Sequence, residues 1–129
     1  MTETIFTKII KGEAPCYKVY EDDKTLAILD IDPLSNGHTL VISKNQVDKV
    51  YELPDSDYQA LFQTVQKVAQ RINDKLGVRA GIVVEGLDIP HAHVHVVPMY
   101  DINVLRLHHG YPVDKSQDAL TAMAEKLEF

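Results

Sequence analysis

Three histidines that alternate with apolar residues are the part of this sequence best suited to chemistry. Residues 91–97 read HAHVHVV. Successive side chains of a β-strand point to opposite faces, so His91, His93 and His95 would line one face and the aliphatic residues between them the other. The pattern therefore predicts a strand over residues 91–98, with a row of imidazoles on one side and a packing surface on the other.

Three interpretations of this row are open. Polar residues of a half-buried strand can simply face solvent, although Thr, Lys or Glu would serve equally well there. His-x-His on a strand is also a zinc-ligand spacing, although no carboxylate or thiol in the segment completes the ligand set. The third interpretation, nucleophilic attack on phosphorus, is favoured, because neutral imidazole is a good nucleophile near neutral pH.

The third interpretation gives each ring a distinct task. If a backbone carbonyl accepts the Nδ1–H of the central ring, that of His93, then its Nε2 keeps a lone pair that can attack phosphorus. The flanking imidazoles could donate hydrogen bonds to phosphoryl oxygens, and one of them could protonate the leaving group. A strand would hold such a row rigidly, which suits phosphoryl-type transfer.

Hydrophobic periodicity predicts the strands around this segment. Apolar and β-branched runs bounded by turn residues are typical of strands. Besides residues 91–98, they cover residues 17–21, 25–31, 38–43 and 80–85. Strands grouped as hairpins, rather than alternating with helices, predict an α+β fold with an antiparallel sheet of about five strands.

Three helices complete the prediction. Residues 5–10 are apolar at helical spacing and predict a short helix before Gly12. Apolar residues at three- and four-residue steps predict one long helix over residues 58–76, ending at Gly77. An amphipathic C-terminal helix is expected from Ser116 onward.

Composition limits the functions that remain. The chain has 129 residues, which predicts a single domain over residues 1–129. A net charge of -6 argues against a nucleic acid polymer as partner but leaves room for a mononucleotide in a local pocket. Cys16 is the only cysteine, which excludes an internal disulfide. No secretory signal and no apolar run of about 20 residues is visible, so we expect a cytoplasmic protein without membrane contact.

At the histidine row the sequence resembles a known family. Residues 91–97 match the histidine triad motif, in which three histidines alternate with apolar residues and two more apolar residues follow. Residues 5–13, IFTKIIKGE, resemble the N-terminal segment of the Hint-like branch. Residues 30–33, DIDP, and 37–42, GHTLVI, resemble its strand pair. The resemblance to the histidine triad (HIT) family covers roughly residues 4 to 100 and implies a histidine-triad-like fold.

The resemblance implies an activity and a partner. Hint-like proteins are homodimers whose subunit sheets join into one, with a pocket for a purine nucleoside monophosphate in each subunit. They cleave phosphorus–nitrogen bonds in nucleoside phosphoramidates, and also aminoacyl adenylates, through a nucleotidyl-histidine intermediate. A small purine nucleotide substrate and a second copy of the chain are therefore the expected partners, and neither a cofactor nor a metal ion is expected.

By motif position the resemblance implies roles for four histidines and one carboxylate. His93 would be the nucleophile, and His95 would contact the leaving-group side. His91 and His38 would support the phosphate and the imidazole network. Asp30 falls where the family places a carboxylate on the ribose hydroxyls. The plainer alternatives are that His38 is a polar residue after the Asn36-Gly37 turn and that Asp30 caps a turn.

The nucleotide base and the loop before the triad involve further residues. Phe6, Ile9 and Ile28 fall where an apolar slot takes the base, although ordinary core packing explains them equally well. Asp88 stands near the phosphate and leaving group, where the family has neutral donors. His108 and His109 match no motif and are expected in a loop.

Two departures from the family pattern are visible. Many relatives carry a cysteine pair near the start that can hold zinc, and Thr4 and Thr7 stand at those places here. The loop before the triad is usually longer and rich in glycine, whereas residues 86–90 read only GLDIP. A carboxylate close to a phosphate repels it unless it turns away.

Alternatives to a phosphoramidate hydrolase therefore stay open. The chain could be a nucleotide-binding module with weak or no hydrolysis, which the short loop with Asp88 would favour. It could be a diadenosine polyphosphate hydrolase, or a zinc protein that uses the three histidines as ligands.

Overall fold

A five-stranded antiparallel sheet with the strand order β1-β2-β3-β5-β4 forms the centre of the fold. The computed structural model describes residues 2–105 and 112–129, so the loop prediction for His108 and His109 lies outside the described residues. The strands are β1 (Lys18–Glu21), β2 (Thr25–Leu29), β3 (Thr39–Ser43), β4 (Arg79–Val83) and β5 (His93–Met99). The helices are α1 (Ile5–Ile10), α2 (Asp55–Leu76) and α3 (Gln117–Leu127), with a 3₁₀ turn at Val50–Glu52. The α+β fold class and the five strands are confirmed.

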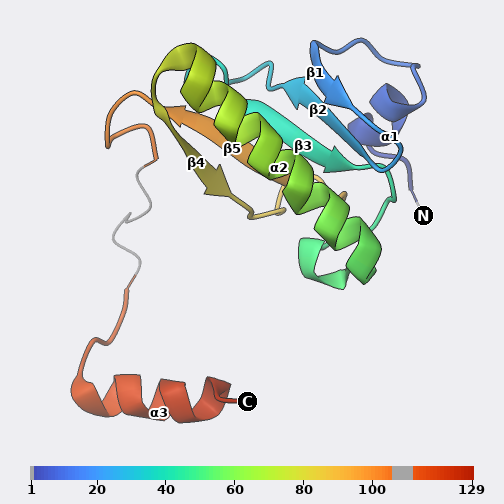
Figure 1. The fold of residues 1–129 in the computed structure, drawn as a ribbon. Helices are drawn as coiled ribbons and strands as arrows, with labels where there is room; N and C mark the ends of the chain where they lie inside the picture. Colours follow the sequence, from blue (N-terminus) through green and yellow to red (C-terminus); the bar gives the residue numbers. More distant parts are fainter. Residues whose placement is uncertain (1, 106–111) are drawn as a thin grey trace.

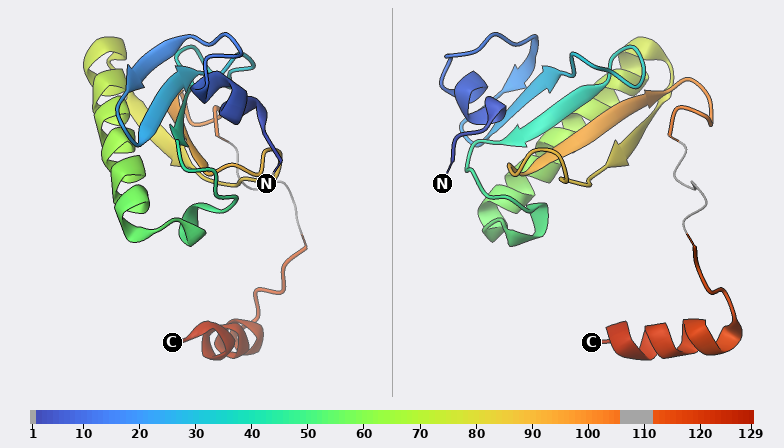
Figure 2. Two further views of the ribbon diagram at one scale, coloured as in Figure 1. Left: turned by 90° about the vertical axis from the view of Figure 1, so that its right-hand side faces the viewer. Right: turned by 180° about the vertical axis from the view of Figure 1, so that it is seen from behind.

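The two faces of the sheet are covered by different helices (Figures 1 and 2). The long helix α2 packs on one face, and its buried Leu61, Val65 and Val68 join a core with Val94 and Val96 of β5. The short helix α1 lies on the other face, on the side of β2 and β3. Its Phe6 is buried in a second apolar cluster, together with residues of β2 and β3 that face α1. Both faces are therefore buried near β3 and β5.

The alternation predicted for the histidine segment holds, but the predicted strand began too early. Ala92, Val94 and Val96 belong to the core on the α2 side, whereas His91 and His93 lie edge-on to the Phe6 ring on the α1 side. The strand β5 nevertheless starts at His93 and not at His91. Just before β5, the Ala92 N–H donates to the carbonyl of Val47, which belongs to no strand, at 2.7 Å.

Two other strands end earlier than predicted. β2 stops at Leu29 instead of residue 31, because the Asp32 N–H donates to Asp30 Oδ1 at 2.9 Å and bends the chain. β4 stops at Val83 instead of residue 85, and Gly86 follows with a φ of 69°. A carboxylate therefore follows each strand end, Asp30 after β2 and Glu85 after β4, and both line the same cavity as the histidines.

The turn before β3 requires glycine. Gly37 has a φ of 100°, a backbone conformation that other residues rarely adopt. A Cβ there would also lie 2.9 Å from Leu76 Cδ1 and 3.1 Å from Pro98 Cγ. The close approach of α2 and β5 to this turn fixes the position of His38, which directly precedes β3.

The C-terminal helix begins where the sequence predicted. Ser116 is the N-cap of α3, and its hydroxyl oxygen accepts from the Ala119 N–H at 3.2 Å. None of its residues is buried, and Figure 1 shows α3 apart from the sheet. Across residues 2–105 and 112–129, no helix has the length and apolar character needed to cross a membrane.

Candidate active site

A cavity of about 630 Å³ lies on the α1 side of the sheet and gathers most of the residues singled out from the sequence. Its polar lining residues are Asp30, Asp32, His38, Glu85, Asp88, His93 and His95. Phe6, Ile9 and Ile28 also line it, and Phe6 and Ile28 are at the same time buried core residues. The expected base slot and the core alternative are thus both compatible with where these side chains lie. The His91 ring is absent from the lining.

His93 is held in one orientation by the chain itself. Its Nδ1 lies 2.7 Å from the carbonyl oxygen of His91. A carbonyl can only accept, so Nδ1 carries the proton and Nε2 keeps the lone pair. The Phe6 and His93 rings pack against each other in a T-shaped arrangement at a centroid distance of 5.0 Å, which restricts the plane of the imidazole further. This is the carbonyl contact that the nucleophile interpretation required.

The Nε2 atom of His93 is open to the cavity. The residue is only 4% exposed, but every fully buried side-chain nitrogen and oxygen in the described chain has a hydrogen-bond partner. His93 Nε2 has no hydrogen-bond partner among the described residues. It therefore cannot be a fully buried atom and must be accessible from the cavity. Because His93 also lines the cavity, a small molecule there can reach this lone pair.

A chain of hydrogen bonds determines which ring nitrogen of His95 carries the proton. The Leu34 N–H donates to His38 Nδ1 at 3.0 Å, so neutral His38 carries its proton on Nε2. That Nε2 donates to His95 Nδ1 at 3.0 Å, and Asp30 Oδ2 lies 3.6 Å from it. Neutral His95 therefore carries its own proton on Nε2 and can donate it to a molecule in the cavity. The structure thus brings His38, Asp30 and His95 together.

His91 occupies a closed environment. The ring is 1% exposed, and its Nε2–H donates to the Ser43 carbonyl at 2.6 Å. Its Nδ1 is then an acceptor, and the Thr4 hydroxyl donates to it at 3.1 Å. The resemblance implied that His91 supports the phosphate and the imidazole network, and in the structure its buried ring does not line the cavity. What His91 offers to the imidazole network is its backbone carbonyl, which holds His93.

Thr4 and Thr7 connect α1 to this closed environment, a contact that sequence reasoning missed. They form a capping box at the start of α1, because each side chain accepts from the other residue's backbone N–H. The Thr7 hydroxyl also donates to Gln46 Oε1 at 2.9 Å. At the places where many relatives carry a cysteine pair, this chain therefore has a neutral hydrogen-bond network.

Burial shifts three of the histidines in the same direction. It lowers the pKa of His38, against the opposing influence of the Asp30 carboxylate. It lowers the pKa of His91, an effect that the Ser43 carbonyl opposes and nearby His93 increases. It also lowers the pKa of His95, where His93 and His38 add to the shift and the carboxylates of Asp30 and Glu85 oppose it. All three rings are therefore neutral at neutral pH, as the proton assignments assume.

Glu85 is a second residue that sequence reasoning missed. Its carboxylate, the His93 ring and the His95 ring each place one ligand-type atom within 4.8 Å of the other two. The signal was available in strand pairing: β4 and β5 are antiparallel with Val83 opposite His95, which brings residue 85 toward residue 93. Asp88, which was singled out, lines the same cavity from the loop that follows.

Two overlapping sets of side chains in this cavity could hold a metal ion. They are Asp30, His38 and His95, and Glu85, His93 and His95. Imidazole and carboxylate together suit zinc and similar divalent ions. Both sets use His95, and the second also uses His93. A metal ion in the second set would therefore occupy the histidine whose Nε2 is otherwise free.

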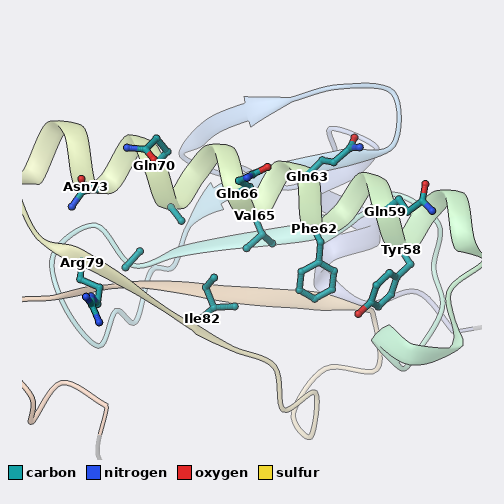
Figure 3. Close-up of a pocket in the computed structure, with 12 residues that line it drawn as sticks. Tyr58, Gln59, Phe62, Gln63, Val65, Gln66, Gln70, Asn73, Arg79 and Ile82 are labelled. Carbon is teal, nitrogen blue, oxygen red and sulfur yellow. The ribbon is translucent and has the colours of Figure 1, made fainter.

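A second hollow, of about 720 Å³, lies between α2 and β4 and has a different character (Figure 3). Glutamine and asparagine side chains from α2 and the Ile82 side chain from β4 line it, with Tyr58 and Phe62 at one end. It contains no histidine and no carboxylate among the described residues that line it. This hollow is therefore not a candidate for the chemistry.

Comparison with known proteins identifies the family. The sequence matches the HIT domain over residues 11–102, so the chain belongs to the HIT family. It is 39% identical over 98 residues to adenosine 5'-monophosphoramidase hnt1 of Schizosaccharomyces pombe, covering 73% of this chain and 72% of the relative. It is 33% identical over 136 residues to adenylylsulfatase HINT3 of Arabidopsis thaliana, covering 96% of this chain and 68% of the relative.

The fold agrees with solved structures of the same family. A crystal structure of a HIT family member from Bacillus subtilis superimposes with a TM-score of 0.80 at 31% sequence identity. The match covers 95% of this chain and 93% of that chain. It confirms the histidine-triad fold that the resemblance implied.

Proposed function

We propose that this protein is a nucleotide hydrolase that cleaves the phosphorus–nitrogen bond of purine nucleoside phosphoramidates through a nucleotidyl intermediate on His93. One observation carries the proposal: His93 Nε2 has a free lone pair facing a cavity while Nδ1 is locked on the His91 carbonyl. Membership of the HIT family supports it, as does the name of the 39% identical monophosphoramidase.

The first step forms one bond and breaks one. His93 Nε2 attacks the phosphorus, and a bond forms between them while the bond from phosphorus to the leaving nitrogen breaks. The anionic phosphoryl group of the bound substrate favours uptake of one proton from solvent by His95, and this imidazolium gives its Nε2 proton to the leaving nitrogen, so that a neutral ring remains and an amine departs rather than its anion. His38 stabilises His95 in the required tautomer through the bond to Nδ1.

The second step reverses the proton transfer. A water molecule attacks the phosphorus of the nucleotidyl-histidine, and His95 Nε2, which now lacks its proton, accepts one from that water. The phosphorus–Nε2 bond breaks, and the nucleoside monophosphate leaves with His93 restored. Asp30 is proposed to accept the ribose hydroxyls, and Phe6, Ile9 and Ile28 to contact the base, since all four line the cavity.

The direct test compares the wild-type protein with His93→Ala on adenosine 5′-phosphoramidate. We expect release of adenosine monophosphate by the wild type and a loss of at least about 10³-fold in kcat for the variant, because the nucleophile is removed. Mass spectrometry of acid-free quenched samples should show the nucleotidyl adduct on the wild type alone. Equal turnover by the two proteins would reject the role of His93.

A nucleotide-binding module without efficient hydrolysis is the second candidate. It is favoured by the short loop of residues 86–90, whose Asp88 lines the cavity where a neutral donor to the phosphate and leaving group was expected. Calorimetry with adenosine monophosphate separates the two candidates. Binding without turnover of any phosphoramidate would favour the module, and turnover abolished by His93→Ala would favour the enzyme.

We further propose that the chain forms a homodimer through β4 and α2. β4 is an edge strand, and its backbone can pair with a second copy to continue the sheet. Beside it, Ile82 is 51% exposed and Tyr58 is 43% exposed along the hollow of Figure 3. Sedimentation should give a dimer for the wild type and a monomer for Ile82→Lys, with Ile102→Lys, on an exposed loop, as a control that stays dimeric. A monomeric wild type would contradict the proposal.

A further inference from the structure

We infer that the cavity selects substrates whose leaving group carries a positive charge, and that Glu85, assisted by Asp88, is the residue responsible. This inference rests on the proposed function, because it concerns the group that departs from phosphorus. It adds a specificity to that function and assigns it to side chains outside the triad.

The charge of the cavity is the first step. Four carboxylates line it, from Asp30, Asp32, Glu85 and Asp88, and no lysine or arginine is found among its described lining residues. A phosphoramidate already carries one negative charge on its phosphoryl oxygens. A leaving group with an ammonium makes the reacting part of the substrate neutral overall, whereas an anionic one adds repulsion.

The position of Glu85 is the second step. Its carboxylate lies beside His93 and His95, within the 4.8 Å group that these three residues form. His95 is the ring that would protonate the leaving nitrogen, so a leaving group held by His95 also faces Glu85. The structure fixes this side chain in its loop, since Glu85 Oε2 accepts from the Leu87 N–H at 3.0 Å. Its other carboxylate oxygen has no hydrogen-bond partner in the described chain.

Asp88 belongs to the same short loop and strengthens the effect. Residues 86–90 connect Glu85 to His91, and Asp88 and Ile89 both line the cavity. Both carboxylates are exposed, but Glu85 lies within the 4.8 Å group that it forms with His93 and His95, and Asp88 does not. We therefore expect Glu85 to contribute the larger share of the selectivity and Asp88 the smaller.

A matched series of substrates tests the inference. Adenosine monophosphate is joined through a P–N bond to 1,4-diaminobutane, butylamine or 4-aminobutyrate, which differ mainly in a terminal positive, absent or negative charge. For the wild type we expect kcat/KM to fall in that order, by about 3- to 10-fold at each step at low salt, and the spread to shrink as salt is added.

The variants assign the effect to its residue. Glu85→Gln should remove most of the spread between the cationic and anionic substrates, and Asp88→Asn a smaller part. Glu52→Gln removes a carboxylate on the 3₁₀ turn, outside the cavity lining, and should leave the spread unchanged.

The outcomes separate this inference from the proposed function. If the wild type hydrolyses all three compounds equally and His93→Ala none, the selectivity is wrong and the hydrolase assignment stands. If the spread is present but unchanged in both Glu85→Gln and Asp88→Asn, the assignment to this loop is wrong. If the wild type and His93→Ala are equally inactive on the butylamine compound, the proposed function fails and this inference with it.

Discussion

The two ends of the histidine row differ sharply although they have the same residue type and spacing. At the His91 end both ring nitrogens are hydrogen-bonded, to the Ser43 carbonyl and the Thr4 hydroxyl, and the ring is 1% exposed. At the His95 end one nitrogen bonds to His38 and the other faces the cavity. The first end is closed and fully satisfied, while the second keeps one polar atom free.

The difference shows that a side chain's function depends on which of its hydrogen bonds are left unmade. Buried polar groups stabilise a fold only when they are satisfied, so the closed end acts on structure. It fixes one carbonyl, that of His91, and this carbonyl in turn orients His93. An imidazole with one free nitrogen can exchange a proton with a substrate, so the open end is suited to chemistry.

The largest effect is expected when the open end is changed. His95→Gln removes the group that protonates the leaving amine, and we expect kcat on adenosine 5′-phosphoramidate to fall by about 10²- to 10⁴-fold. The urea midpoint should move little, because His95 is only partly buried. Steady-state kinetics and urea unfolding measure the two quantities.

A substrate with a good leaving group provides the control for His95→Gln. The 4-nitrophenyl ester of adenosine monophosphate expels an anion that needs no proton, so the variant should retain most of its activity on it. An equal loss on both substrates would show that His95 has a role other than proton donation.

The next effect concerns His38, whose hydrogen bond to His95 Nδ1 keeps the His95 proton on Nε2. His38→Ala removes the donor to His95 Nδ1, so that His95 can take the wrong tautomer. We expect a loss of about 10- to 100-fold in kcat, as for other groups that orient a functional imidazole. Ser35→Ala in the preceding turn removes only a bond to the Pro98 carbonyl and should cost far less. A loss in kcat as small as that of Ser35→Ala would argue against the proton assignment.

At the closed end the expected effect is on stability. Thr4→Val removes the hydroxyl that donates to His91 Nδ1 and accepts from the Thr7 N–H, so a buried acceptor loses its partner and α1 loses its N-cap bond, which together cost about 1–3 kcal/mol of unfolding free energy. Thr4→Ser keeps the hydroxyl and serves as the matched control in urea unfolding. If Thr4→Val and Thr4→Ser were equally stable, the hydrogen bond to His91 would contribute nothing.

Local patterns predicted most of the site. The alternation of residues 91–97 placed the histidines on the face opposite Val94 and Val96, and the Asn36-Gly37 signal located the turn before His38. The need for a carbonyl on His93 Nδ1 followed from imidazole chemistry alone and is met by His91. These features depend on neighbours within a few residues, which a sequence shows directly.

Contacts between distant segments could not be predicted in the same way. Thr4 and His91 are 87 residues apart, and nothing local to either residue predicts that they meet. Strand ends were equally difficult, since β5 starts at His93 only because Ala92 bonds to Val47. Glu85 was missed although strands were predicted over residues 80–85 and 91–98, because its place beside His93 follows only from the register in which β4 pairs with β5.

The smallest effect is a pH dependence of stability that both ends of the row share. Burial lowers the pKa of His38, His91 and His95 in the folded chain. Below their ordinary value of about 6.5 the unfolded chain therefore binds more protons than the folded one, so acidification favours unfolding. The urea midpoint should fall steadily between about pH 7 and about pH 5, before aspartates such as Asp22 and Asp57, whose pKa values are themselves lowered, begin to titrate.

Removing one histidine should reduce this pH dependence without abolishing it. His95→Gln eliminates one of the three shifted groups, so its urea midpoint should fall less than that of the wild type over the same range. Thr4→Val should keep a dependence, because His91 is still buried and still titrates. A wild-type midpoint that stays constant between about pH 7 and about pH 5 would contradict the neutral, buried state of these rings. The proton assignment at the open end, which requires neutral His38 and His95, would then be wrong as well.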